Sequence, residues 1–242
     1  MADENRNLEI KNMKISEFSY KASHHLVWRA EQLLIDIQSS SINKELKKLG
    51  CLTKKDITTH MTAHELNMLY ILAKELGESA KALEIGSYLG ASSCYIAAAL
   101  APKDGHLFCV DTWENQTMPE GEKDTLNEFK TNTRAVGNHI TMIRKNSQEL
   151  TPSDFTEYPL SLVFIDGDHS YQGAKNDYEK ANPWIVGGGI LAFHDCIAFE
   201  GVARTIGEAL ASGNWKFGGQ VDNLLWLRKV EKGFLEFEHS AF

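Results

Sequence analysis

Cysteine is scarce in this sequence and never closely paired. The four cysteines, Cys51, Cys94, Cys109 and Cys196, lie far apart in a chain of 242 residues. The absence of any CxxC pair argues against a zinc ribbon or a dithiol redox centre. We expect four buried, reduced thiols instead, as in a protein of a reducing compartment.

Long hydrophobic runs are also missing. No stretch approaches the roughly 18 apolar residues needed to cross a bilayer. The opening residues, MADENRNLEIKNMK, are too polar to form the apolar centre of a signal peptide. We therefore expect a cytoplasmic protein that makes no use of a membrane.

Positive charge is in deficit. Lys and Arg number 25 against 33 Asp and Glu, a net charge of −8. A protein that binds a phosphate backbone needs a basic face, so nucleic acid is not the expected partner. Residues 1–60 are slightly basic, however, which leaves a local contact open. The composition otherwise, with 43% hydrophobic residues, is that of a globular protein. The chain is long enough to bury a core without metal or disulfide cross-links.

The spacing of apolar residues changes along the chain. Helical spacing predicts one helix over residues 23–49 and a second from Ala63 to Leu76, which Thr62 and Glu65 open as a capping box. After Gly77, apolar segments with the character of strands alternate with helical segments. The predicted strands are KALEIG, HLFCVD, HITMIRK, LSLVFIDG and GGGILAFHD, and the predicted helices cover Ser92–Leu100, Glu122–Val136, Gln172–Ala181 and Val202–Ala211.

This alternation predicts an α/β fold of the Rossmann-like, doubly wound type, with a mostly parallel sheet covered on both faces. Two further segments, NWKFGGQ and NLLWLRKV, predict an antiparallel C-terminal hairpin that completes seven strands. We expect residues 1–60 to form a helical extension, acting as a cap or an oligomer contact, and residues 61–242 to form the Rossmann-like domain.

A glycine loop follows the first predicted strand, from Glu84 to Ser92. Gly86 allows a sharp turn and the close approach of a ligand, and Gly90 allows close packing where the next helix begins. The spacing ExGxxxGxS differs from the GxGxxG of dinucleotide sites. An acid at Glu84 would repel a pyrophosphate and attract a cationic amino-acid group. A tight turn with no ligand is the alternative interpretation.

The second predicted strand ends at Asp111, whose carboxylate suits the two hydroxyls of a ribose. Trp113, just beyond, either stacks on a base or packs in the core. Both positions lie at the edge of the sheet where open α/β folds bind their ligands.

Acids and imidazoles gather where the fourth and fifth predicted strands end. They are Asp166, Asp168, His169, His194 and Asp195. Neighbouring parallel strands would bring them together, and charged groups at the ends of apolar strands need partners. A divalent cation, a general base, or both would explain the cluster. Asp168 as a helix cap and His194 as a core histidine are the alternatives.

Five segments together resemble the class I S-adenosylmethionine-dependent methyltransferases: LEIGSYLGAS, CVDTWEN, RKNSQEL, VFIDGDHSYQGAKNDY and GGGILAFHDC. The resemblance covers roughly residues 60–230. It is greatest to the small-molecule O-methyltransferases of the macrolide-sugar and antibiotic-tailoring type, and more distant to catechol O-methyltransferase.

The resemblance implies a role for each motif. It places the cofactor on the glycine loop, the second strand end and two later positions: Glu84, Gly86, Ser87, Tyr88, Gly90, Ser92, Asp111, Thr112, Trp113, Ser147, Gln148 and Asp166. It implies a divalent cation, Mg²⁺ or Mn²⁺, on Asp166, His194 and Asp195, and a catalytic base at His169. The sequence departs from metal-dependent relatives at His194, where they carry an acid.

The predicted function is therefore methyl transfer to a hydroxyl of a small molecule, such as a glycosylated metabolite or a diol, by a homo-oligomer. Three alternatives stay open. The first is an NAD(P)-dependent oxidoreductase on the same fold, and the second is an RNA methyltransferase. The third is a non-catalytic protein that keeps the cofactor fold.

Overall fold

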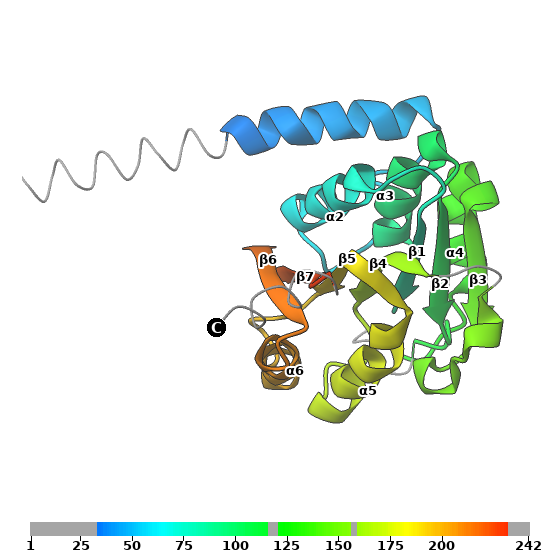
Figure 1. Ribbon diagram of the computed structural model, residues 1–242. Coiled ribbons are helices and arrows are strands. Elements are labelled where there is room, and N and C mark those ends of the chain that lie inside the picture. Colours follow the sequence, from blue (N-terminus) through cyan, green and yellow to red (C-terminus); the bar gives the residue numbers. More distant parts are fainter. Residues whose placement is uncertain (1–32, 116–120, 156–158, 232–242) are drawn as a thin grey trace, which may run out of the picture. The chain divides into compact units, whose positions relative to one another are not determined.

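The computed structural model describes residues 33–115, 121–155 and 159–231 (Figure 1). The chain forms two compact units, residues 1–41 and 42–242. The described part of the first unit, residues 33–41, is helical, and the same helix continues to residue 48 in the second unit. The helix predicted over residues 23–49 is thus present from residue 33, and its earlier part lies outside the described residues.

A seven-stranded sheet forms the centre of the second unit, in the order β3-β2-β1-β4-β5-β7-β6. Five strands run parallel: β1 (Lys81–Ile85), β2 (His106–Asp111), β3 (Ile140–Arg144), β4 (Leu160–Ile165) and β5 (Ile185–Phe193). β6 (Trp215–Val221) and β7 (Leu224–Lys229) form an antiparallel hairpin that joins the sheet where β7 pairs with β5. The predicted Rossmann-like fold and its C-terminal hairpin are both confirmed.

The strand order reverses direction between β1 and β4. Ligands of open α/β sheets bind outside the carboxyl ends of the strands at such a switch point. The glycine loop after β1 and the acid cluster after β4 and β5 both lie at this edge of the sheet.

Helices cover both faces of the sheet (Figure 1). α2 (Ala63–Glu75), α3 (Ala91–Leu100) and α4 (Leu126–Thr133) pack on one face, and α5 (Tyr171–Ala181) and α6 (Glu200–Ala211) on the other. Alternation along the strands explains the two layers, because successive side chains point to opposite faces. In β5, Ile190 and Ala192 join the first core while Leu191 and Phe193 join the second.

One predicted helix, Glu122–Val136, is shorter in the structure. α4 begins at Leu126 because the backbone N–H groups of Lys123 and Thr125 donate to the carbonyls of Glu114 and Trp113, which ties that stretch to the loop after β2. Beyond Thr133 the chain tightens into a 3₁₀ helix, Arg134–His139.

The predicted capping box opens α2. The Thr62 hydroxyl accepts from the Glu65 N–H at 3.2 Å, and the Thr62 N–H donates to Glu65 Oε2 at 2.6 Å. Ile42 and Leu46 are buried in the same core as α2 and α3, so the chain packs with the sheet from residue 42 onward. The role predicted for residues 1–60, as a cap or an oligomer contact, stays a prediction.

All four cysteines are buried and free, as predicted. Among the described residues, no helix is both long enough and apolar enough to span a membrane.

Candidate active site

The glycine loop turns sharply against the end of β4. Gly86 has φ +87°, and a Cβ at this position would lie 2.1 Å from the carbonyl oxygen of Asp166. Gly90 has φ +86°, and its Cβ would lie 2.6 Å from a methyl carbon of Thr133. Both positions need glycine. The close approach predicted at Gly86 is thus made by the chain itself, which places Asp166 beside the loop.

Asp111 holds this loop in shape. Its Oδ2 accepts hydrogen bonds from the backbone N–H groups of Ser87 (2.9 Å) and Tyr88 (2.8 Å), and its Oδ1 accepts from that of Trp113 (2.6 Å). A carboxylate has about four acceptor positions, so room is left for a hydroxyl. The structure therefore gives Asp111 a task in the fold that the sequence did not suggest, beside the predicted ribose contact.

Asp111→Asn is expected to weaken S-adenosylmethionine binding by on the order of tenfold to a hundredfold, because charge-assisted hydrogen bonds contribute about 1.5–3 kcal/mol. Calorimetric titration measures the change. Asp104→Asn is the matched control, since Asp104 is exposed in a turn away from the loop. Equal affinity in Asp111→Asn and the wild type would rule out the ribose assignment.

Glu84 is fully buried below the loop. Its Oε2 accepts from the Ser93 hydroxyl of α3 and lies 3.5 Å from Cys109 Sγ of β2. Burial raises the pKa of Glu84 above its usual value, which favours the neutral acid and weakens the predicted attraction for a cationic group. Glu84 Oε1 and the buried Ser87 hydroxyl make no hydrogen bond within the described ranges. These two polar atoms fit the polar amino-acid end of a cofactor.

Three further predicted cofactor residues, Ser92, Thr112 and Trp113, lie in the segments that follow β1 and β2. Trp113 is completely buried; its ring packs 5.0 Å from that of Phe129, and its Nε1 donates to the Tyr88 carbonyl at 3.1 Å. That geometry supports the packing alternative rather than stacking on a base. Ser92 is buried in the first turn of α3, and Thr112 is half-buried directly after β2.

Ser147 and Gln148, the predicted adenine contacts, lie in a 3₁₀ turn after β3. The Gln148 side chain donates to Asp177 Oδ1 at 3.1 Å. Asp177 belongs to α5, and burial raises its pKa to about 6. Its other oxygen is buried without a hydrogen bond to any described residue.

Asp177→Asn is expected to raise the unfolding free energy by about 1–3 kcal/mol at pH 8, because each pKa unit corresponds to about 1.4 kcal/mol. A carboxyl whose native pKa lies above its unfolded pKa destabilises the fold once it ionises. The folded protein therefore loses stability as the pH rises from the ordinary Asp pKa of 3.8 toward 6 and beyond. The gain should therefore vanish below pH 4. Urea unfolding at both pH values measures it, with the exposed Asp104→Asn as the control. A gain of equal size at both pH values would contradict this explanation.

Four of the five acids and imidazoles predicted to meet do so: Asp166, His169, His194 and Asp195. Ile165 of β4 pairs with Phe193 of β5, so the residues that follow these strands are neighbours. His169 Nε2 lies 3.5 Å from Asp166 Oδ1 and 3.3 Å from Asp195 Oδ2. Burial would lower the pKa of His169, but Asp166 and Asp195 outweigh it and raise that pKa above the usual value. Asp168 instead turns to the Ser170 N–H at 2.8 Å and supports the residue that caps α5.

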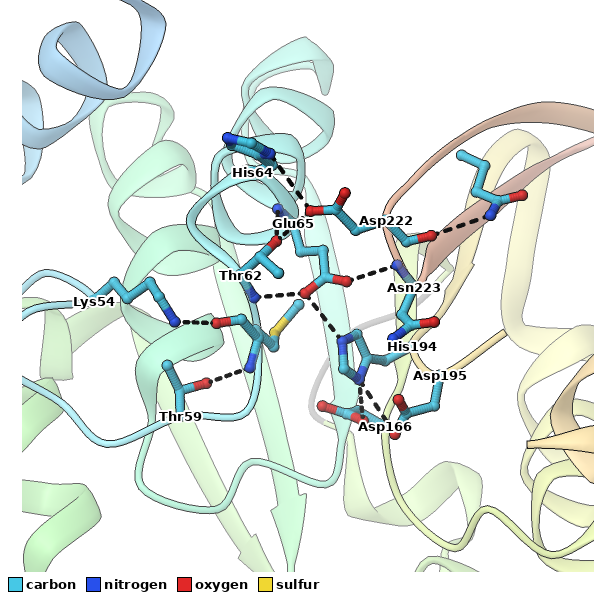
Figure 2. A network of polar contacts seen from close by, with 12 residues as sticks. Lys54, Thr59, Thr62, His64, Glu65, Asp166, His194, Asp195, Asp222 and Asn223 are labelled. Atoms are coloured by element: carbon cyan, nitrogen blue, oxygen red, sulfur yellow. Dashed lines mark hydrogen bonds and ion pairs between the residues drawn. The ribbon is translucent and has the colours of Figure 1, made fainter. Parts of the chain in front are cut away.

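His194 occupies the centre of the cluster. Its Nδ1 lies 3.2 Å from Asp166 Oδ1 and 3.5 Å from Asp195 Oδ2, and its Nε2 lies 3.2 Å from Glu65 Oε2 (Figure 2). Burial would lower the pKa of His194, yet the three carboxylates raise it to about 12.

Glu65 is the site residue that the sequence analysis missed. The capping box identified Glu65 only as a helix cap. Its partner His194 is 129 positions away, and no local pattern connects the two. Burial would raise the pKa of Glu65, but His194 and the backbone N–H groups of Thr62 and Asn223 lower it.

The predicted metal ligands lie close enough to share a cation. Nδ1 of His194 faces oxygens of both Asp166 and Asp195, and Nε2 lies against Glu65, as in a histidine ligand held by a carboxylate behind it. Asp166, His169 and Asp195 form a second grouping, with one ligand atom from each within 4.8 Å. A cation on this second grouping would occupy the lone pair that His169 needs as a base. The divalent cation on Asp166, His194 and Asp195 stays a prediction.

Comparison with known proteins bears on this arrangement. Residues 83–196, from β1 to just beyond β5, match a family described as a methyltransferase domain. These residues form a methyltransferase domain. The match confirms the resemblance to class I S-adenosylmethionine-dependent methyltransferases, and it includes the glycine loop, Asp111 and the cluster around His169.

Solved structures similar to this methyltransferase domain share its fold at low sequence identity. The O-methyltransferase NovP is 11% identical, with a TM-score of 0.58 over 83% of this chain and 99% of its own. A candidate caffeoyl-CoA O-methyltransferase from Staphylococcus aureus is 16% identical, with a TM-score of 0.57 over 82% and 98%. A candidate rRNA methylase from Clostridium thermocellum is 15% identical, with a TM-score of 0.50 over 73% and 100%. The fold alone therefore leaves the acceptor undetermined.

Proposed function

We propose that this methyltransferase transfers the methyl group of S-adenosylmethionine to a hydroxyl of a small molecule, with His169 as the general base. One observation carries the proposal. Asp166 lies against Gly86 through its backbone and 3.5 Å from His169 Nε2 through its side chain. The base is thus beside the loop that would hold the cofactor.

The cofactor contacts proposed here are those implied by the resemblance. The methionine part would contact the glycine loop and Asp166, the ribose Asp111 and Thr112, and the adenine Ser147 and Gln148. Since the Trp113 ring is buried in the core, its contribution would come from its backbone. When bound, S-adenosylmethionine supplies an electrophilic methyl group. The protein must hold the acceptor oxygen in line with it, and such positioning can contribute about 7–11 kcal/mol.

His169 would take the proton of the acceptor hydroxyl. The ring is half-buried, and its pKa is raised by two carboxylates that stabilise the protonated form. Asp166 and Asp195 therefore act on the base. A divalent cation held by Asp166, His194 and Asp195, where the resemblance implies one, would supply a positive charge that lowers the pKa of an acceptor hydroxyl bound to it.

The rim beside His169 favours an acceptor with an apolar body. The Phe199 ring centroid lies 4.6 Å from that of His169, and Phe199 and Ile197 are 44% and 68% exposed. Exposed apolar side chains next to a catalytic group contribute to ligand sites. Two acids beside the base would repel the phosphates of an RNA acceptor. A phenol or another apolar hydroxyl compound fits these surroundings.

Two measurements test the proposal. Calorimetry should show binding of S-adenosylmethionine and no binding of NADH. Labelled cofactor should then transfer its methyl group to members of a panel of phenols, diols and glycosides, and not to ribosomal RNA. Labelling of RNA alone would establish the nucleic-acid alternative, and binding of NADH alone would establish the oxidoreductase.

A further inference from the structure

A buried carboxylate of α5 lies behind the turn that follows β3. Asp177 is 1% exposed, and its Oδ1 accepts from Gln148 Nε2 at 3.1 Å. Its Oδ2 has no hydrogen bond to any described residue and faces Gly167, where a Cβ would lie 3.3 Å away. Burial raises the pKa of Asp177 to about 6, so its ionisation costs the fold stability above that pH. A buried acid of this kind is a candidate for a functional role.

The backbone of the turn is held by other groups. Ser147–Glu149 form a 3₁₀ helix, and the Asn146 side chain accepts from the Gln148 N–H at 2.9 Å. Lys180, one helical turn after Asp177 on α5, donates to the Gln148 carbonyl at 2.5 Å. The backbone of Gln148 is therefore fixed without Asp177, and the hydrogen bond from Asp177 acts on the side chain alone.

This hydrogen bond decides which end of the Gln148 amide points away from α5. An ionised carboxylate can only accept, so it takes the amide NH₂ and not the amide carbonyl. Because the amide is planar, its carbonyl oxygen Oε1 then points away from Asp177. Gln148 is exposed. An exposed acceptor oxygen that is held in one direction suits an N–H donor of a ligand.

We propose that Asp177 is a positioning residue that orients the Gln148 amide, so that this methyltransferase selects the amino group of adenine over a keto group. The inference rests on the proposed function, which brings the adenine to Ser147 and Gln148. The amino group of adenine donates hydrogen bonds, whereas the oxygen at the same position of hypoxanthine only accepts. Asp177 is buried and cannot touch the base, so it acts through Gln148.

Without Asp177 the Gln148 amide is free to turn over and to offer its NH₂ group instead of its carbonyl. An amide that adopts both orientations can bond either an amino group or a keto group. Loss of Asp177 should therefore remove the selectivity for adenine more than it removes binding itself. A residue that only supported the turn would change the affinity for both bases together.

Two ligands test the inference: S-adenosylhomocysteine, and S-inosylhomocysteine, which carries hypoxanthine in place of adenine. Calorimetry at pH 8, where Asp177 is ionised, gives the ratio of their dissociation constants without any methyl transfer. The wild type should prefer the adenosyl ligand by on the order of tenfold to a hundredfold, because a keto oxygen facing Oε1 is left without a hydrogen bond.

Asp177→Leu and Gln148→Ala should each lower that ratio by on the order of tenfold. The double variant should lower it no further, since Asp177 acts only through Gln148. Glu179→Leu is the matched control on α5, because the Glu179 side chain is 59% exposed and pairs with Lys175. Its ratio should equal that of the wild type.

Lys180→Met distinguishes selection from support of the turn. It removes a hydrogen bond to the backbone, so both ligands should weaken together at an unchanged ratio. The same behaviour in Asp177→Leu would overturn the inference. If Asp177→Leu does not fold, Gln148→Ala on the exposed turn decides, and an unchanged ratio in that variant would overturn it as well.

The wild-type titrations separate this inference from the proposed function. Equal affinity of the wild type for the two ligands would overturn the inference and leave the methyltransferase proposal intact. A wild type that binds neither ligand would contradict the proposed function, and the inference with it.

Discussion

His169→Gln is expected to lower kcat by on the order of 10²–10⁴, the usual contribution of a positioned general base. S-adenosylmethionine affinity should stay unchanged, because the glycine loop and Asp111 are not altered. Single-turnover assays with labelled cofactor measure the chemical step, and calorimetry measures binding. His139→Gln is the matched control, since this histidine lies before β3 and contacts the Gly105 carbonyl, outside the cluster.

The pH profile makes the expectation for His169 more specific. The ring must be neutral to accept a proton, and Asp166 and Asp195 raise its pKa above 6.5. Wild-type activity should therefore fall as the pH drops through that raised pKa. This acid limb should be absent from the residual activity of His169→Gln. A variant that keeps most of its activity with the same acid limb would show that another group is the base.

Glu65→Gln is expected to lower the unfolding free energy by up to about 3 kcal/mol at pH 7. Breaking a buried pair costs about 3–5 kcal/mol, because the remaining charge is left without its partner. The lower end applies here, since Asp166 and Asp195 still face His194. Glutamine at this position can keep the capping box, but its NH₂ group cannot also accept from the Asn223 N–H. The change therefore reports the charge together with that one hydrogen bond, and not the helix cap.

The pH dependence gives the sign of the Glu65 contribution. A carboxyl whose native pKa is lowered stabilises the fold above its unfolded pKa and loses that stability as the pH falls through the native value. The deficit of Glu65→Gln should therefore be present at pH 7 and shrink as the pH is lowered below 4.5. Urea unfolding at several pH values measures it.

Glu75→Gln is the matched control for this experiment. Glu75 lies on the same helix, and its ion pair with Arg228 is about half exposed on both sides. Exposed pairs contribute about 0–1 kcal/mol. Equal deficits for Glu65→Gln and Glu75→Gln would show that burial of the His194 pair adds nothing.

Local patterns in the sequence were sufficient to predict the helices and strands and the two layers into which they pack. Alternating apolar residues in β5 divide between two cores, and Thr62 with Glu65 marks the start of α2, because both signals arise from neighbours in the chain. The late start of α4 was not predictable, since it depends on hydrogen bonds from residues 123 and 125 to the loop after β2.

The candidate site shows the same division. Strand ends identified Asp111, Asp166, His169, His194 and Asp195, because neighbouring parallel strands bring their carboxyl ends to one edge. Only the tertiary structure decided what each of them faces. In the tertiary structure the Trp113 ring packs against Phe129, Asp111 accepts hydrogen bonds from the backbone of the glycine loop, and Glu65 lies against His194. The sequence determines which polar groups reach the sheet edge. Which carboxylates surround His194 depends on how Glu65, Asp166 and Asp195, from three separate segments of the chain, pack together.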